Sequence, residues 1–258
     1  MKIKHVTITG ADNNTDINDL IEISEKYPFV EWGILFSPTR NLKHEPRYPS
    51  IDWVLDLKEK TKGLNMKFSA HVCGDYTREF LENGTSNLVN ENIKNYVTNL
   101  FDRAQLNFNA TKCNVSEKFY ELLKNNSQKH NIIIQYNKTN SEVCQKIIEQ
   151  KIPVHFLYDG SGGRGVSPTQ WQPPIQNHFT GYSGGLRTFN LKEQLSKIHT
   201  EVDNDYALRN KQYAEERHDF ICGNGAKHYE GEFKGCPTEI WIDVETGVRI
   251  SPTNIQGD

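Results

Sequence analysis

The segment 67–75, KFSAHVCGD, carries residue types that suit acid–base or nucleophilic chemistry. In an extended strand, side chains two positions apart share one face, which places Ser69, His71 and Cys73 together with Cys73 at the end of the run. A thiol beside an imidazole can act as a base or a nucleophile. The same pattern also suits a small lining residue above a hydrogen-bonded histidine, and the sequence leaves both interpretations open.

A second acid–base candidate, Asp159, ends the run HFLYD and is followed by a glycine-rich stretch. A carboxyl group at the end of a strand can serve as a general acid. Backbone N–H groups at Gly162 and Gly163 could approach an anion closely, and Arg164 could add positive charge. The alternative is a mobile glycine loop with a capping aspartate.

Eight short apolar runs alternate with longer amphipathic segments, which is typical of βαβ units around a parallel sheet. Helical spacing of apolar residues predicts helices over residues 16–27, 50–61, 116–129, 141–151 and 190–198. The expected strands cover residues 3–10, 30–37, 67–73, 104–108, 131–136, 154–159, 179–183 and 239–244. Eight such units predict an α/β protein with one (β/α)8 barrel domain over residues 1–258, and an open doubly wound sheet is the alternative.

Glycine turns also follow the last two expected strands. GYSGGL contains Gly184 and Gly185, and IDVETGV contains Asp243 and Gly247. Barrel enzymes commonly bind phosphate on the loops after strands seven and eight, where bare N–H groups contact the anion. The sequence therefore predicts phosphate binding at these turns, with Asp243 near the substrate.

Six segments in order resemble the motif series of phosphoribosylanthranilate isomerase over nearly the whole chain: TITGAD, GILFSP with PRYPS, FDRAQLN, LYDGSGG, GYSGGL and IDVETGV. The resemblance implies a cytoplasmic enzyme of tryptophan biosynthesis that carries out an Amadori rearrangement of a phosphorylated sugar. It implies that Asp159 is the general acid and that Arg47 receives the anthranilate carboxylate. It also implies that Gly184, Gly185 and Gly247 hold the phosphate.

The chain departs from this family at the residue that acts as the base. The family has a cysteine in a Lys-Ile-Cys-Gly motif on the first strand, and this chain has Thr9 at that position. A threonine hydroxyl is too weakly acidic to act as a base near neutral pH without help, so Cys73 with His71 is the candidate replacement. The family's Leu-His-Gly element on the fourth strand is replaced by LNFN, which leaves Gln105, just before it, and Asn107 as candidate substrate contacts.

Two further functions remain open at this level. A barrel that lost its base could bind a phosphorylated ligand without turning it over. A different sugar-phosphate reaction, such as that of a lyase or aldolase, could use the same end of the barrel, although no lysine lies at an expected strand end to form a Schiff base.

Residues 199–237 are expected to form a long polar insertion before the last strand, because the segment is too long for an ordinary loop. The final helix is expected to be missing or very short, so the insertion should cover the outer face of the last strand. A second copy of the chain is the alternative cover. The covering candidates are Tyr206, Leu208, Tyr213, Phe220 and Ile221. The spacing of His218, Cys222, His228 and Cys236 fits no familiar zinc site, so we expect no metal there.

Composition limits the partners and the compartment. The net charge is −3 with both signs intermixed, which disfavours nucleic acid and anionic membranes as partners. The five cysteines are widely spaced without a C-x-x-C pair, which favours reduced thiols in the cytoplasm. No apolar run reaches the roughly 18 residues that span a bilayer. We expect a small phosphorylated sugar as ligand, no cofactor, and a monomer or homodimer.

Overall fold

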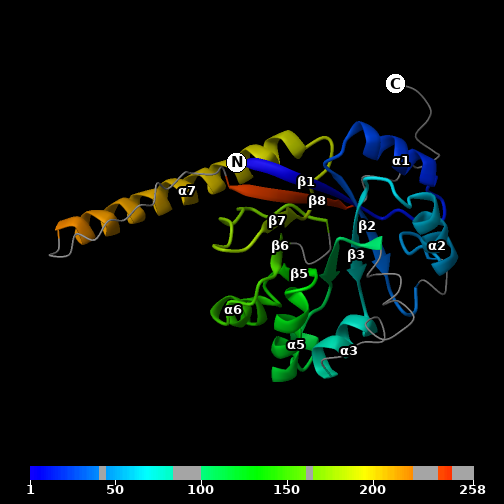
Figure 1. Ribbon diagram of the computed structural model, residues 1–258, viewed down its shortest axis with the longest axis horizontal. Coiled ribbons are helices and arrows are strands. Elements are labelled where there is room, and N and C mark those ends of the chain that lie inside the picture. Colours follow the sequence, from blue (N-terminus) through cyan, green and yellow to red (C-terminus); the bar gives the residue numbers. More distant parts are fainter. Residues whose placement is uncertain (41–44, 84–99, 161–164, 223–237, 246–258) are drawn as a thin grey trace.

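A closed ring of eight parallel strands forms the centre of the molecule (Figure 1). The computed structural model describes residues 1–40, 45–83, 100–160, 165–222 and 238–245. Neighbouring strands pair in sequence order, and β8 closes on β1. The strands are β1 (Lys2–Thr9), β2 (Val30–Phe36), β3 (Lys67–Val72), β4 (Arg103–Leu106), β5 (Asn131–Tyr136), β6 (His155–Asp159), β7 (Thr180–Ser183) and β8 (Glu239–Glu245). The predicted (β/α)8 barrel is confirmed, and the open sheet is wrong.

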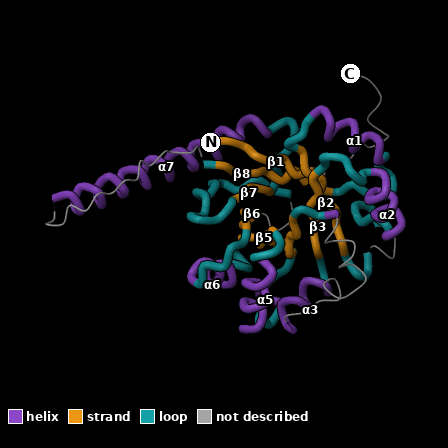
Figure 2. The backbone as a smooth tube through the Cα atoms, viewed as in Figure 1, coloured by secondary structure: helices purple, strands orange, loops and turns teal. Residues whose placement is uncertain are grey.

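Helices surround the barrel on the outside (Figure 2). They are α1 (Ile17–Lys26), α2 (Ile51–Lys60), α3 (Asp75–Asn83), α5 (Glu117–Ser127), α6 (Ser141–Glu149) and α7 (Leu191–Cys222), with a short 3-10 helix η2 (Ala110–Lys112) after β4. Local capping explains where several begin. The Asp16 carboxylate accepts a hydrogen bond from the Asn18 amide, and the Ser50 hydroxyl accepts one from the Trp53 amide.

The segment between β6 and β7 differs from the regular alternation, because its described residues 165–179 contain no helix. Three prolines, Pro168, Pro173 and Pro174, lie in this segment and disfavour helical backbone. Trp171 instead packs edge-on against Tyr182 with 5.7 Å between ring centroids. Its indole N–H donates a hydrogen bond to Gln194 of α7 at 3.0 Å, so an extended segment covers β7 in place of a helix.

Helix α7 also differs from expectation, because it does not end near residue 198 but continues to Cys222. Residues 199–222 contain no glycine or proline, and Gly223 is the first residue that would stop a helix. The first part of the predicted insertion is therefore a continuation of α7, which extends beyond the barrel (Figure 1). Residues 223–237 lie outside the described residues.

The outer face of β8 is covered by α7, which joins the predicted helix 190–198 to the first part of the predicted insertion. Ile198 and Val202 are buried in one cluster with Ile240 and Ile242 of β8. The covering residues differ from those expected, since Leu208 is 56% exposed. The side chains of Tyr213, Phe220 and Ile221, and the chain after residue 245 where a final helix would lie, are outside the described residues.

The inside of the barrel is unusually polar. At its amino-terminal end the Arg103 guanidinium binds Glu31 through Nε–Oε2 (2.8 Å) and Nη2–Oε1 (2.6 Å), and it lies 4.4 Å from the ring centroid of Trp241. The Thr7 hydroxyl donates to Glu31 as well. Burial alone would raise the pKa of Glu31, but the charge and hydrogen bonds of Arg103 outweigh it and hold that pKa below its usual value. The carboxylate therefore stays ionised inside the barrel.

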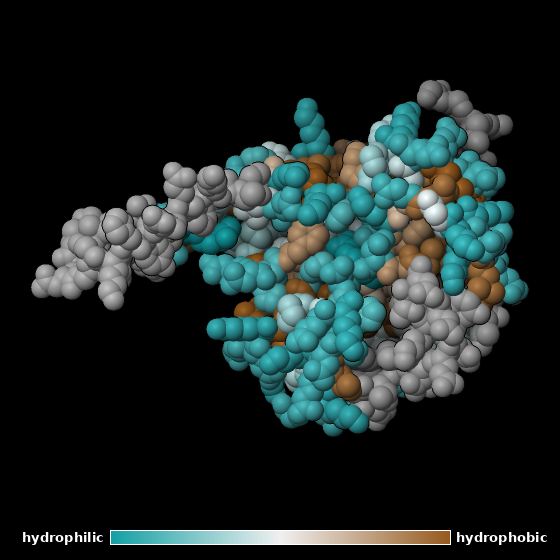
Figure 3. All heavy atoms as spheres, in the orientation of Figure 1, coloured by the Kyte–Doolittle hydropathy of each residue, from teal (hydrophilic) through white to brown (hydrophobic). Residues whose placement is uncertain are grey.

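Polar side chains cover most of the described surface on the face shown in Figure 3. None of the helices in the described part of the chain is long and apolar enough to cross a membrane.

Candidate active site

A cavity of about 380 Å³ opens at the carboxyl ends of β1 to β5, which is the end where barrel enzymes hold their active sites. Six of the residues predicted from the sequence line it: Thr9, Arg47, His71, Cys73, Gln105 and Asn107. The structure therefore brings the candidates of the first, second, third and fourth strand ends into one site. Gln135 at the end of β5 completes the wall next to β6.

Cys73 follows the last residue of β3 and is held by polar groups on both sides. Asn107 donates a hydrogen bond from Nδ2 to the Cys73 sulfur at 3.2 Å, and the Tyr48 hydroxyl also binds the sulfur. Burial raises the pKa of the Cys73 thiol, while these two hydrogen bonds and the charge of Arg47 act in the opposite direction. The site thus holds a neutral thiol, and hydrogen-bond donors for its thiolate form are already in place.

The orientation of the Asn107 amide is fixed by a second hydrogen bond. Gln105 donates from Nε2 to Asn107 Oδ1 at 2.7 Å, which leaves the Asn107 Nδ2 group to face the sulfur. Gln105 lies in β4, and Asn107 is the first residue after that strand. The LNFN sequence therefore supplies an oriented donor to Cys73.

His71 lies one layer below Cys73 and is only 2% exposed. Its Nε2 atom is buried and has no hydrogen-bond partner among the described residues. Burial lowers the pKa of His71 to about 4, Glu31 acts against this, and Arg103 and Arg47 add to it. The imidazole is therefore neutral near pH 7, the form that can accept a proton.

Gly33 of β2 lets side chains of β1 and β3 approach each other. A Cβ on Gly33 would overlap the Thr9 hydroxyl and would lie 3.0 Å from His71 Nε2. The Thr9 hydroxyl itself donates a hydrogen bond to Asp243 Oδ1 of β8 at 2.9 Å. Thr9 thus holds a buried carboxylate and lies next to the imidazole.

Asp159 ends β6 as predicted and is 1% exposed. Its Oδ2 atom accepts a hydrogen bond from Gln135 Nε2 at 2.8 Å. Gln135 lines the cavity, whereas Asp159 is one side chain further from it. The carboxyl is therefore connected to the cavity through an amide that a ligand could displace.

Arg47 is held in place by its backbone. Its φ of 75° is in the left-handed region, where a residue other than glycine is strained, and its amide donates to Asp12 Oδ2 at 2.8 Å. The Arg47 Nε atom is buried without a partner among the described residues. Gly10, whose φ is 117°, lies beside this side chain, and a Cβ there would be in ordinary contact at 3.6 Å from Arg47 Nε.

The glycine turn after β7 has a structural explanation of its own. Gly184 and Gly185 have φ values of 103° and 64°. A Cβ on Gly185 would overlap the backbone of Ser167, whose hydroxyl donates to the Gly185 carbonyl. Gly185 therefore accommodates the segment that replaces the helix after β6. Gly162, Gly163, Arg164 and Gly247 lie outside the described residues.

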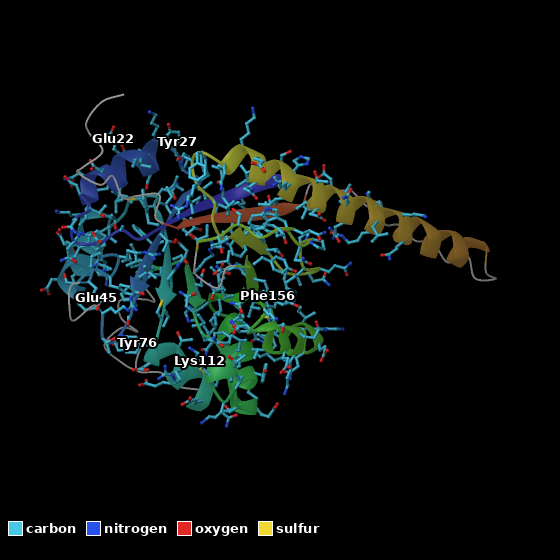
Figure 4. The ribbon with its side chains drawn as sticks, turned by 180° about the vertical axis from the view of Figure 1, so that it is seen from behind. Glu22, Tyr27, Glu45, Tyr76, Lys112 and Phe156 are labelled. Carbon is cyan, nitrogen blue, oxygen red and sulfur yellow. The ribbon has the colours of Figure 1, made fainter. Side chains whose placement is uncertain are left out.

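Three charged or phenolic residues of the cavity were not singled out from the sequence. Tyr48 directly follows Arg47, Arg78 lies in α3, and Lys112 ends η2. Figure 4 shows Glu45, Tyr76 and Lys112, which belong to the same three segments, along one side of the barrel. Each of the three segments follows a strand, and this position is the sequence feature from which a place at the cavity could have been predicted.

No group of three or more potential metal-ligating side chains occurs within the described part of the chain. The side chains of His218, Cys222, His228 and Cys236 lie outside it. Cys73, Cys113 and Cys144 are free thiols.

No family model matches the chain, and no curated protein matches it. Two similar solved structures are both of phosphoribosylanthranilate isomerase from Thermotoga maritima. The enzyme itself is 13% identical over 98% of this chain and 91% of the other, with a TM-score of 0.48. A structure of "mutually generated monomers" of the dimeric enzyme is 15% identical with the same coverage and TM-score. The likeness concerns the barrel and assigns no role to any residue.

Proposed function

We propose that this protein is an enzyme that isomerises a small phosphorylated sugar by acid–base catalysis, in an Amadori-type reaction like that of phosphoribosylanthranilate isomerase. The observation that supports the proposal best is the Cys73 sulfur, which lies in a carboxyl-end cavity between the Asn107 amide and the Tyr48 hydroxyl. A thiol can act as a base only as the thiolate, and these donors stabilise the thiolate.

In this reaction Cys73, as the thiolate, removes the C2′ proton of the ring-opened imine and becomes a thiol. Asp159, in its protonated form, first donates a proton to the ribose ring oxygen, so that the ring opens. Asp159 reaches the cavity by exchanging its hydrogen bond with Gln135 for one with the sugar. Apo hydrogen bonds of this kind often rearrange when substrate binds.

The neighbouring residues orient the ligand and the two reacting groups. Gln105 and Asn107 present amides to the sugar hydroxyls, and Arg47 offers an unsatisfied donor to an anionic group. The hydrogen bond of Thr9 keeps the buried Asp243 carboxylate ordered in β8. The turn that contains Gly184 and Gly185 is the phosphate contact that the resemblance implies.

A second candidate is a barrel that binds a phosphorylated ligand without chemistry. The feature that favours it is Thr9, whose hydroxyl occupies the position of the family's base and donates to Asp243. The two candidates differ in turnover, not in ligand class.

Direct assay distinguishes them. The full chain is mixed with phosphoribosylanthranilate and the loss of its fluorescence is followed, in parallel with complementation of a tryptophan auxotroph. Turnover that falls by roughly two to four powers of ten in Asp159→Asn supports the enzyme. Tight binding of the same compound with no turnover would establish the binding protein instead.

A further inference from the structure

We propose that the side of the cavity formed by the segments after β2, β3 and β4 binds a phosphate group, held by Arg47, Arg78, Lys112 and the N-terminus of α3. The inference rests on the proposed function for the sugar part of the ligand. It departs from the resemblance, which implies a carboxylate at Arg47 and phosphate at the turns after β7 and β8.

The charge of this wall favours a dianion. Arg47, Arg78 and Lys112 reach the cavity from three separate segments, and the described lining contains no aspartate or glutamate. Arg78 pairs with Asp75 at 2.6 Å, but both side chains are about half exposed, so the pair is weak and exchangeable. Counting Asp75 against the three cations leaves an excess of two positive charges. A phosphate monoester matches this excess, whereas one carboxylate does not.

Several donors of the wall have no partner of their own. Arg47 Nε is buried and has no partner among the described residues, and the backbone of Arg47 is strained. His71 Nε2 is likewise buried and unsatisfied at the floor of the same cavity. Buried polar atoms without partners cost free energy, and a bound anion would remove that cost at the Arg47 donor. Strain at such a residue is typical of ligand sites.

Helix α3 adds backbone donors at the same place. It begins at Asp75, directly after Gly74, which lines the cavity with a φ of 68°. The first helical hydrogen bond runs from the Arg78 amide to the Gly74 carbonyl. The amides before Arg78 therefore face the cavity end of the helix, where a phosphate is favoured by both the N–H groups and the helix dipole.

The turn after β7 leaves little room for an anion at Gly185. The space that Gly185 leaves is taken by the backbone of Ser167 rather than by an open surface. A phosphoryl group on the Arg47 side places the adjoining sugar carbons over Cys73 and Asn107. The ligand is thus anchored by phosphate beside the proposed base.

Calorimetric titration of the full chain with inorganic phosphate tests this site. Arg78→Gln and Lys112→Gln should each weaken phosphate binding by about tenfold, the effect of removing one charge-assisted hydrogen bond. Lys118→Gln, an exposed lysine of α5 outside the cavity, is the matched control and should bind as the parent does. Lys112→Arg should retain binding, which separates loss of charge from loss of fold.

Arg187→Gln tests the competing site, because Arg187 lies just beyond the Gly184–Gly185 turn. Phosphate binding that is lost in Arg187→Gln but unchanged in Arg78→Gln and Lys112→Gln would overturn the proposal, as would no phosphate binding at ~10 mM. Titration with ribose 5-phosphate distinguishes a sugar ester from free phosphate: a sugar-phosphate site binds the ester more tightly. These outcomes need no turnover, so this inference can fail while the isomerase proposal stands, and the reverse.

Discussion

Asn107 donates a hydrogen bond to the sulfur of Cys73 across 3.2 Å, and this contact joins the ends of β3 and β4 at the mouth of the barrel. A neutral thiol gains little from such a donor, whereas a thiolate gains much more. The contact therefore makes the Cys73 thiol more acidic than its burial alone would allow. In the proposed function, it is the feature by which a chain with threonine at position 9 can still present a base.

Replacing Asn107 by Ala should raise the pKa of the Cys73 thiol further. A hydrogen bond to a charged group contributes about 1.5 kcal/mol or more, so the thiolate fraction at a given pH should fall by about tenfold. The measurement is the rate of iodoacetamide labelling at Cys73 against pH, read by peptide mass spectrometry. Cys144, whose burial raises its pKa to about 12, is the internal control and should stay unreactive in both proteins. An unchanged pH profile at Cys73 would show that the amide does not act on the sulfur.

Gly33→Ala should destabilise the protein, because the added methyl would overlap the Thr9 hydroxyl and press on His71. Overpacking of this kind costs about 1 to 3 kcal/mol, measurable by urea unfolding. Adding Thr9→Ala should recover part of that loss, since the overlapping atom is removed. If the changes in unfolding free energy of the two substitutions simply add, the Thr9 hydroxyl does not occupy the space beside Gly33.

Stability should fall as the pH drops from 6.5 toward 4. Burial lowers the pKa of His71 to about 4, so between these values the unfolded chain binds a proton that the folded chain does not. A shift of this size corresponds to about 3 kcal/mol of folding free energy. This contribution is fully present above pH 6.5 and is lost as the pH falls toward 4. Burial likewise lowers the pKa of His5 and His155 to about 4, so they add to the slope.

Urea unfolding at several pH values checks this. His71→Gln should flatten the slope between pH 6.5 and 4, while His130→Gln, an exposed residue, should leave it unchanged. Equal slopes for His71→Gln and the parent would mean that His71 is not buried in its neutral form.

Helix α7 should stabilise the barrel only through its first turns. Ile198→Ala should cost about 2 to 5 kcal/mol, as is usual for a buried isoleucine, because Ile198 packs on β8. Leu208→Ala on the same helix should change stability by less than about 0.5 kcal/mol, since that side chain is largely exposed. Thermal unfolding of the two variants decides the matter. Similar losses would mean that the later part of α7 also packs on the barrel.

The strands and their closure could be predicted because their signal is local. Runs such as 30–37 and 131–136 combine β-branched and aromatic residues, and glycine, proline or polar residues bound them. The order of eight such runs then favours a barrel. The continuation of α7 past residue 198 was also visible in principle, since no helix-breaking residue occurs before Gly223.

Other parts of the site depend on contacts that no sequence spacing reveals. The approach of Thr9 to His71 across Gly33 arises only when three strands pair in register. Arg78 and Lys112 lie in α3 and η2, and their direction toward the cavity follows from how these elements pack on the barrel. The residues at strand ends could therefore be predicted, whereas the contribution of Arg78 and Lys112 to the cavity could not.

The central claim is that Cys73 removes a carbon-bound proton from a phosphorylated sugar. The most direct measurement follows exchange of the C2 proton of an aminosugar phosphate, such as phosphoribosylanthranilate, into D2O by proton NMR. The account predicts exchange with the parent protein and a loss of roughly two to four powers of ten in rate with Cys73→Ala. In that variant phosphate binding should be retained. Undiminished exchange in Cys73→Ala, or none with the parent protein under saturating ligand, would contradict it.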